Sequence, residues 1–148
     1  MQNIAKGPFK GKGEYRNNWR MKSLRESLGQ LHGERQVTIK TMYSLINDYE
    51  RTFSGSLTAY LAFHKTVNGN YVRWRMNGIK QRYFAIANND IGETFIRAQS
   101  VTVRRVLLDF EQHRLRLNLL HGLCFYEAKS LEKFIESTRR VNQLAQEK

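Results

Sequence analysis

Two Asn-Gly dipeptides, Asn68-Gly69 and Asn77-Gly78, stand nine residues apart in the sequence. Both central residues of a type I′ turn need positive φ, which Asn and Gly adopt readily, so this dipeptide is a strong signal for a β-hairpin. The flanking segments are rich in aromatic and branched residues; they cover residues 57–67, 70–76 and 79–87. The sequence therefore predicts three antiparallel strands joined by two tight turns.

A helical period precedes and follows these strands. Apolar residues recur at steps of three or four between residues 19 and 53, and again after Val103. The stretch "FSGS" predicts the end of the first helix, and Asp90 with Glu93 predicts a helix start. We expect His121-Gly122 to bend or break the second helix. The first apolar seam comprises Leu24, Leu28, Leu31, Ile39, Met42, Ile46, Tyr49 and Phe53, and the second comprises Val103, Val106, Phe110, Leu117, Leu120, Cys124, Leu131 and Phe134.

The predicted fold is α+β: a long helix, a three-stranded antiparallel β-meander and a long helix. The two helices are expected to form an antiparallel helical hairpin with the sheet at one end. Residues 1–18 predict a flexible basic N-terminal arm, and residues 19–148 predict a single α-β-β-β-α domain, long enough to bury a core. Narrow apolar seams bury little surface, so some apolar surface of the helices is expected to stay uncovered. This favours a homodimer or a partner protein bound through the helices.

The positions of the two turns predict which residues lie opposite one another. Around Asn77-Gly78, Val72 is expected opposite Tyr83, and Tyr71 opposite Phe84. One predicted face is apolar and packs on a helix; it comprises Leu57, Ala59, Leu61, Phe63, Val72, Trp74, Met76, Ile79 and Tyr83. The other face comprises Tyr60, His64, Tyr71, Arg73, Arg75, Lys80, Arg82 and Phe84.

This second face is basic without acidic compensation. No Asp or Glu occurs from Ser56 to Ile86. The predicted register places Arg75 opposite Lys80 and Arg73 opposite Arg82, and like charges facing one another destabilise a sheet. It also places His64 opposite Arg73. The whole chain has 25 Lys and Arg against 13 Asp and Glu, a net charge of +12. A polyanion would supply the missing negative charge; the alternative is a solvated face that is basic by chance.

The residue types on this face suit nucleic acid. Arginine can contact base edges or phosphates, lysine contacts phosphates, and aromatic rings stack on bases or pack on sugars. The predicted site comprises Arg73, Arg75, Arg82, Lys80, His64, Tyr60, Tyr71 and Phe84, with phosphate contacts from the N-terminal residues Lys6, Lys10, Lys12, Arg16 and Arg20. Four arginines of the second helix either form a third basic group or pair with acidic residues of the first helix; they are Arg104, Arg105, Arg114 and Arg116.

The stretch "YVRWRMNGIKQRYFAI", residues 71–86, resembles the hairpin of the arm-type DNA-binding domains of tyrosine recombinases. That resemblance implies a three-stranded sheet placed against DNA. The long helix before the sheet and the lack of a recombinase catalytic domain depart from that family. The whole chain is similar in type to small basic accessory proteins of conjugative and integrative mobile elements, which implies a role beside a relaxase or a recombinase.

The sequence carries no recognisable catalytic motif. Its single cysteine, Cys124, cannot form an internal disulfide, and the four histidines do not combine with it in a metal-ligand spacing. A phosphate-binding GxxxxGK[ST] loop is also absent from the sequence. We therefore expect a protein that is not an enzyme and that uses no metal and no cofactor.

The location and function follow from the same observations. The N-terminus lacks an apolar signal segment, and no run of about eighteen apolar residues occurs, so we expect a cytoplasmic protein without a membrane partner. The predicted function is sequence-specific binding of duplex DNA by an accessory protein of a mobile genetic element, in DNA processing, transfer, recombination or transcription. Two alternatives stay open: an RNA- or single-strand-binding module, and a phage or plasmid inhibitor or scaffold whose basic face binds an acidic protein surface.

Overall fold

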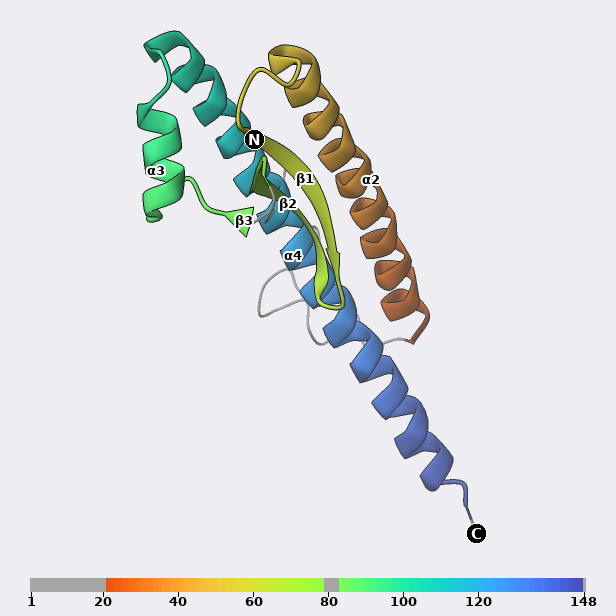
Figure 1. Ribbon diagram of the computed structural model, residues 1–148. Helices are drawn as coiled ribbons and strands as arrows, with labels where there is room; N and C mark the ends of the chain where they lie inside the picture. The colour runs from red at the N-terminus through yellow and green to blue at the C-terminus, as the bar shows by residue number, and fades with distance from the viewer. Residues whose placement is uncertain (1–20, 79–82, 148) are drawn as a thin grey trace. The chain divides into compact units, whose positions relative to one another are not determined.

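A computed structural model describes residues 21–78 and 83–147 (Figure 1). The elements follow in the order α2 (Met21–Phe53), β1 (Ala59–Thr66), β2 (Gly69–Met76), β3 (Tyr83–Phe84), α3 (Asp90–Arg97) and α4 (Val101–Leu144). The predicted α+β order of a long helix, a three-stranded antiparallel sheet and a long helix is confirmed. The strand order in the sheet is β1-β2-β3, so β2 is the central strand.

Helix α2 ends at the stretch that predicted its end. After Phe53 the backbone adopts positive φ at Ser54 (47°) and at Gly55 (72°). The Ser54 amide donates to the Glu50 carbonyl, and the Ser56 amide donates to the Phe53 carbonyl. These bonds occupy carbonyls that the end of a helix otherwise leaves without a partner, and the turn leads the chain into β1.

The helical region after the sheet is divided into α3 and α4, a division that the sequence analysis did not predict. Helix α3 begins where Asp90 and Glu93 indicated a start. At the beginning of α4 the Ser100 hydroxyl accepts a hydrogen bond from the Val103 amide, as an N-cap residue does. The Arg104 guanidinium donates to the carbonyls of Arg97 and Gln99 and so holds the corner between the two helices.

Helix α4 continues without a break through His121-Gly122, so the expected break there is wrong. Nothing lies within 4 Å of the position that a Gly122 Cβ would occupy, which means that this glycine is not required by close packing. The His121 side chain is fully buried. Its contact with the sheet, described below, accounts for its place on the helix.

The hairpin between β1 and β2 turns one residue earlier than predicted. Thr66 pairs with Gly69, so the turn residues are Val67 and Asn68. Gly69 has φ of 129°, and its Cβ would lie 3.5 Å from the His121 ring, so glycine suits this position in both respects. The register therefore moves by two residues, which leaves the two faces of β1 as predicted.

The pairing between β2 and β3 differs from the prediction by three residues. Trp74 pairs with Phe84 and Arg75 pairs with Tyr83, where the turn at Asn77-Gly78 had predicted Tyr71 opposite Phe84. An odd shift exchanges the two faces of a strand. Phe84 accordingly lies in the core, only 9% exposed, and Tyr83 lies on the opposite face.

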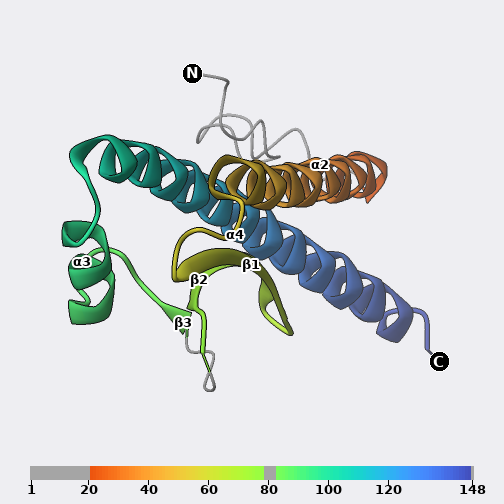
Figure 2. The ribbon, with the colours of Figure 1, turned by 45° about the horizontal axis from the view of Figure 1, so that its top comes forward.

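The chain divides into two compact units, and the larger one spans Thr38–His121. In this unit the sheet lies against the second half of α2 and the first half of α4, and α3 lies beside β3 (Figures 1 and 2). Its core joins all these elements; it comprises Met42, Leu45, Tyr49, Ala59, Leu61, Val72, Trp74, Phe84, Ile86, Phe95, Ile96 and Leu107. The predicted packing of the apolar sheet face on helices is thus confirmed for the described residues of that face, apart from Tyr83; Ile79 lies outside the described ranges.

The other unit holds the described residues up to Val37 and from Gly122 onward. Here the two long helices pack through Leu24, Leu31, Ala128 and Leu131. The Cys124 thiol lies 3.8 Å from a Glu34 carboxylate oxygen, and burial, together with this neighbouring carboxylate, raises the pKa of the thiol. A thiol in this state is a weak nucleophile. Phe134, expected in the seam, is 39% exposed instead.

Candidate nucleic-acid interface

Strand β2 is held along one edge by polar side chains of α4. The Val72 amide donates to Asn118 Oδ1 at 2.9 Å, and the Val72 carbonyl accepts from Asn118 Nδ2 at 2.9 Å and from Arg114 Nη1 at 3.1 Å. The Asn70 amide donates to His121 Nε2 at 3.0 Å. Strand β3 pairs with β2 only at Trp74 and Arg75. Asn118 and His121 therefore take the place of a neighbouring strand for the backbone of Asn70 and Val72.

The same row of α4 anchors the Trp74 side chain. The Trp74 indole nitrogen donates to Glu111 Oε2 at 2.6 Å. Arg114 forms a fork on the same carboxylate, with distances of 2.7 Å and 2.8 Å to its two oxygens. Glu111 is only 6% exposed, and the paired guanidinium and indole compensate its burial.

Asn118→Ala is expected to lower the free energy of unfolding by about 1–3 kcal/mol, because it leaves the Val72 amide without a partner. The nearby Gln112→Ala, at an exposed position of the same helix, should change it by less than about 0.5 kcal/mol. Urea unfolding followed by circular dichroism measures both values. Equal stability of the two variants would show that Asn118 does not anchor the strand.

Alternation along the strands turns a second set of side chains to the other face of the sheet. Residues 70, 72 and 74 have their backbone or side chains engaged by α4, whereas Tyr71, Arg73 and Arg75 point away from the core. Across the ladder, Tyr60 pairs with Arg75. We call this surface the basic face; it comprises Tyr60, Ala62, His64, Tyr71, Arg73, Arg75 and Tyr83.

The arginines of the basic face lie over aromatic rings. The Arg73 guanidinium is 5.6 Å from the centre of the Tyr71 ring and 5.3 Å from that of Tyr83. The Arg75 guanidinium is 4.9 Å from the centre of the Tyr83 ring. Tyr83 also stacks on His64, with 4.5 Å between the ring centres and 15° between the planes. Cation–π contacts of this kind hold a guanidinium in place without neutralising its charge.

The basic face contains polar atoms that the protein itself does not satisfy. His64 Nδ1 and Arg75 Nε are covered from solvent and have no hydrogen-bond partner. No acidic side chain belongs to this face, and neither Arg73 nor Arg75 forms an ion pair in the described part of the chain. The two arginine charges without acidic neighbours favour a binding role for this surface over a purely structural one.

Five predicted site residues are brought together on the basic face: Tyr60, His64, Tyr71, Arg73 and Arg75. The prediction for Phe84 is wrong, because the register of β3 turns this ring into the core against Trp74 and Phe95. The remaining predicted residues, like the predicted N-terminal arm of residues 1–18, lie outside the described ranges; they are Lys80, Arg82, Lys6, Lys10, Lys12, Arg16 and Arg20.

Tyr83 is the residue of this face that the sequence analysis assigned to the core. The sequence contained a signal for this orientation: Phe84 and Ile86 are apolar residues two positions apart, so they share a face of the strand. In the structure both are buried. Treating those two wholly apolar residues as the core-facing pair would have turned Tyr83 to the basic face. The predicted facing of Arg75 and Lys80 is also wrong, because Arg75 pairs with Tyr83. Arg73 likewise pairs with Ala62 instead of the predicted His64.

The arginines of α4 do not form one basic group. Arg114 is committed to Glu111 on its own helix, and Arg104 to the corner after α3. Arg105 and Arg116 are exposed. The predicted alternative, pairing with acidic residues of the first helix, is not what engages Arg104 or Arg114.

No family model, curated protein or solved structure matches this chain. Within residues 21–78 and 83–147, no three His, Cys, Asp or Glu side chains gather as a metal site would require. Nor does any helix in these ranges contain a stretch both long and apolar enough to cross a bilayer. The basic face is therefore the feature of the molecule that bears on its function.

Proposed function

We propose that the protein binds nucleic acid, duplex DNA in particular, through the basic face, without catalysing a reaction. The observation that carries this proposal is the pair of arginines, Arg73 and Arg75, set over tyrosine rings on a sheet without acidic residues. A guanidinium placed in this way presents its N–H groups to a guanine edge or to a phosphate. A surface with this composition favours a polyanion as its ligand.

The anchoring of β2 supports a reading role for these arginines. Arg73 lies between Val72 and Trp74, and α4 binds both of these neighbours. The Arg73 side chain consequently starts from a backbone that is held on both sides, and Arg75 follows directly after the held Trp74. Contacts that discriminate bases need such positioning, because small errors in geometry remove a bidentate hydrogen bond.

The arrangement of Tyr83 favours duplex DNA over unpaired bases. Binding of single strands depends on aromatic rings whose faces are free to stack on bases. Tyr83 already stacks on His64 and carries two guanidinium groups over its ring. The N–H groups of the arginines are therefore better placed to bind a ligand than the tyrosine ring is.

Arg73→Ala and Arg75→Ala are each expected to weaken binding to a preferred duplex by about 1–3 kcal/mol if they contact bases. The site is first selected from a random duplex pool at about 150 mM salt, and affinity is then measured by fluorescence anisotropy. The logarithm of the affinity should fall with the logarithm of salt concentration by about 0.9 for each phosphate contacted. Arg73→Lys keeps the positive charge but removes the paired N–H donors of the guanidinium, so this variant should also lose sequence preference.

The matched control is Arg105→Ala/Arg116→Ala, which removes two exposed positive charges from α4 in the same unit. It should leave the sequence preference unchanged. If the control and Arg73→Ala/Arg75→Ala lose equal amounts of DNA affinity, the basic face contributes only general charge attraction. Stronger binding to RNA or to single-stranded DNA of the same sequence would show that this nucleic acid, and not duplex DNA, is the preferred ligand. Absence of binding to all three would refute the proposal.

The biological setting of this proposal depends on the resemblance of residues 71–86 to the arm-type domains of tyrosine recombinases. In that setting the protein is a cytoplasmic accessory factor of a mobile genetic element, and it helps a recombinase or relaxase to recognise its site. The selected DNA sequence tests this setting, since it should occur beside the ends or the transfer origin of such an element.

A further inference from the structure

Helix α4 carries apolar residues on more of its surface than the chain itself covers. Leu107 is fully buried in the core, and Phe110 and Leu117 pack against that core. Leu108, which follows Leu107, is exposed. A helix that is apolar on all sides is typical of one that is buried on all sides. The sequence of this part of α4 therefore indicates a further partner for the helix.

The exposed apolar residues of this part of α4 form one stripe. The steps between them are seven, seven and four residues, which bring all of their side chains to one side of the helix. We call this surface the apolar stripe; it is about 27 Å long and lies within the Thr38–His121 unit. It comprises Val101, Leu108, Leu115 and Leu119, which are between 40% and 61% exposed.

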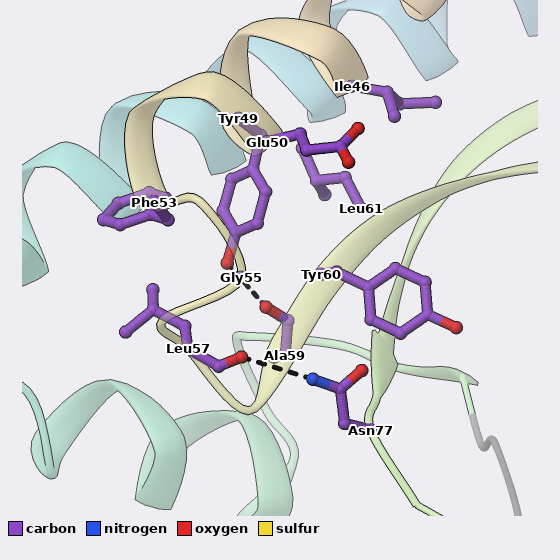
Figure 3. A pocket seen from close by; sticks show the side chains of 10 residues that line it. All are labelled: Ile46, Tyr49, Glu50, Phe53, Gly55, Leu57, Ala59, Tyr60, Leu61 and Asn77. Carbon is purple, nitrogen blue, oxygen red and sulfur yellow. Dashed lines mark hydrogen bonds between the residues drawn. The ribbon is translucent and has the colours of Figure 1, made fainter.

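Helix α2 of the same unit leaves no comparable stripe among its described residues. Its apolar side faces the sheet, and the hydroxyl of the buried Tyr49 donates to the Ala59 carbonyl of β1 at 2.7 Å (Figure 3). Tyr43 is the one large apolar residue of α2 in this unit that is exposed, and its ring stacks on that of Phe63. The apolar stripe is therefore a feature of α4 alone.

Charged residues without a partner lie along one side of the apolar stripe. Asp109 and Arg116 are exposed, and neither forms an ion pair within residues 21–78 and 83–147. They are seven residues apart, so they share a side of the helix. On the other side of the stripe, Glu111 and Asn118 are engaged by β2. Only the side with Asp109 and Arg116 is therefore free to form ion pairs with a partner.

We propose that the apolar stripe binds the same stripe of a second copy of the chain, with the two α4 helices antiparallel. Leu108 of each copy faces Leu119 of the partner subunit, and Leu115 lies beside the two-fold axis. Asp109 of each copy faces Arg116 of the partner subunit. The same surface is thus used twice, as in the two-fold dimers that are common among soluble proteins.

The charges beside the stripe determine the direction of the two helices. In an antiparallel pair, each side of the stripe meets the same side of the partner's stripe, so Asp109 and Arg116 form two equivalent ion pairs. In a parallel pair, they would meet the side on which Glu111 and Asn118 are already engaged by β2. An apolar stripe whose charges complement one another in this way is the reason for choosing a second copy as the partner.

We expect the dimer to be weak. Four apolar side chains from each copy make a small interface, and each copy has a net charge of +12, which opposes association. A dissociation constant of about 10–100 µM follows for an interface of this kind. The dilute protein in which DNA binding and unfolding are measured is therefore monomeric. The inference does not depend on the proposed DNA binding, which uses the basic face.

Sedimentation velocity of the full chain without nucleic acid, from about 5 to 500 µM, measures the dimer. Leu115→Asp should weaken dimerisation by about tenfold or more, because it places two carboxylates beside the two-fold axis. Val67→Asp is the matched control, since it makes a similar change at a position of the same unit that is 95% exposed, and it should have no effect. A chain that stays monomeric throughout, or a dimer that Leu115→Asp leaves intact, would overturn the proposal.

A charge exchange tests the antiparallel direction. Arg116→Asp alone should weaken dimerisation by about fivefold or more, because carboxylates then face one another across the interface. Adding Asp109→Arg reverses each ion pair and should restore the wild-type dissociation constant. Adding Glu50→Arg instead gives the same net charge at an exposed position of α2 and should not restore it. Restoration by both additions, or by neither, would contradict the antiparallel pairing of the two helices.

Discussion

Gly92→Ala is expected to unfold the Thr38–His121 unit. Gly92 lies in α3, where a Cβ would stand 1.8 Å from the Ala85 carbonyl oxygen and 2.7 Å from the Ile86 Cα. Both of these atoms belong to the backbone, so no side-chain rotation can relieve the contact. The helix and the segment after β3 would have to separate by more than an ångström.

That separation acts on the core of this unit. Phe95 and Ile96 of α3 are buried, and the Phe95 ring contacts the rings of Phe84 and Trp74. Moving α3 therefore opens the packing around β3 and around the central strand. We expect a loss of more than about 3 kcal/mol in the free energy of unfolding, at the upper end of what overpacking costs.

Gly33→Ala is the matched control, because the same atom is added where nothing lies within 4 Å. Gly33 is in the interior of α2, so alanine should stabilise the helix by about 1 kcal/mol. The two substitutions are thus expected to have opposite signs. Urea unfolding and the Trp74 indole resonance report on the two variants. A folded Gly92→Ala protein with wild-type stability would contradict the close approach of α3 to the sheet.

The elements of this fold were largely predictable because their signals are local. The helix end at "FSGS", the helix start at Asp90 and the apolar periods each depend on a few neighbouring residues. The faces of β1 and β2 were also predictable, since the error of two residues at Asn68-Gly69 preserves alternation. The face of β3 was not, because its pairing with Trp74 is set by the burial of Phe84 and Ile86 instead of by the turn dipeptide.

The polar row of α4 illustrates what a single sequence does not reveal. Glu111, Arg114, Asn118 and His121 are spaced by three or four residues, as a solvent-exposed helix face would also be. Only the structure shows that they meet the backbone of β2 and the indole of Trp74. Their partners lie 37 to 51 residues away in the sequence. These long-range contacts position the strand that carries the arginines of the basic face. The residue types of the candidate site could therefore be predicted from the sequence, but the α4 side chains that hold the strand could not.

Arg114→Met is expected to lower the free energy of unfolding by about 3–5 kcal/mol. Methionine retains much of the packing of the arginine stem but removes both bonds to the Glu111 carboxylate and the bond to the Val72 carbonyl. Among the described residues, Glu111, at 6% exposure, would keep the Trp74 indole as the single hydrogen-bond partner of its carboxylate. A buried carboxylate without its guanidinium is costly, since neither water nor another cation replaces the lost interaction.

The pair Glu111→Gln and Arg114→Met separates this cause from simple loss of packing. In the double variant the amide of Gln can still accept from the Trp74 indole, and no charge remains buried. The double variant should therefore be more stable than Arg114→Met alone, with a coupling free energy of about 1–3 kcal/mol in a double-mutant cycle. Arg116→Met, at an exposed position two residues along α4, should change stability by less than about 0.5 kcal/mol. If the double variant instead loses the sum of the two single losses, the Glu111 charge is not what makes Arg114 necessary, and the guanidinium contributes through its bond to Val72.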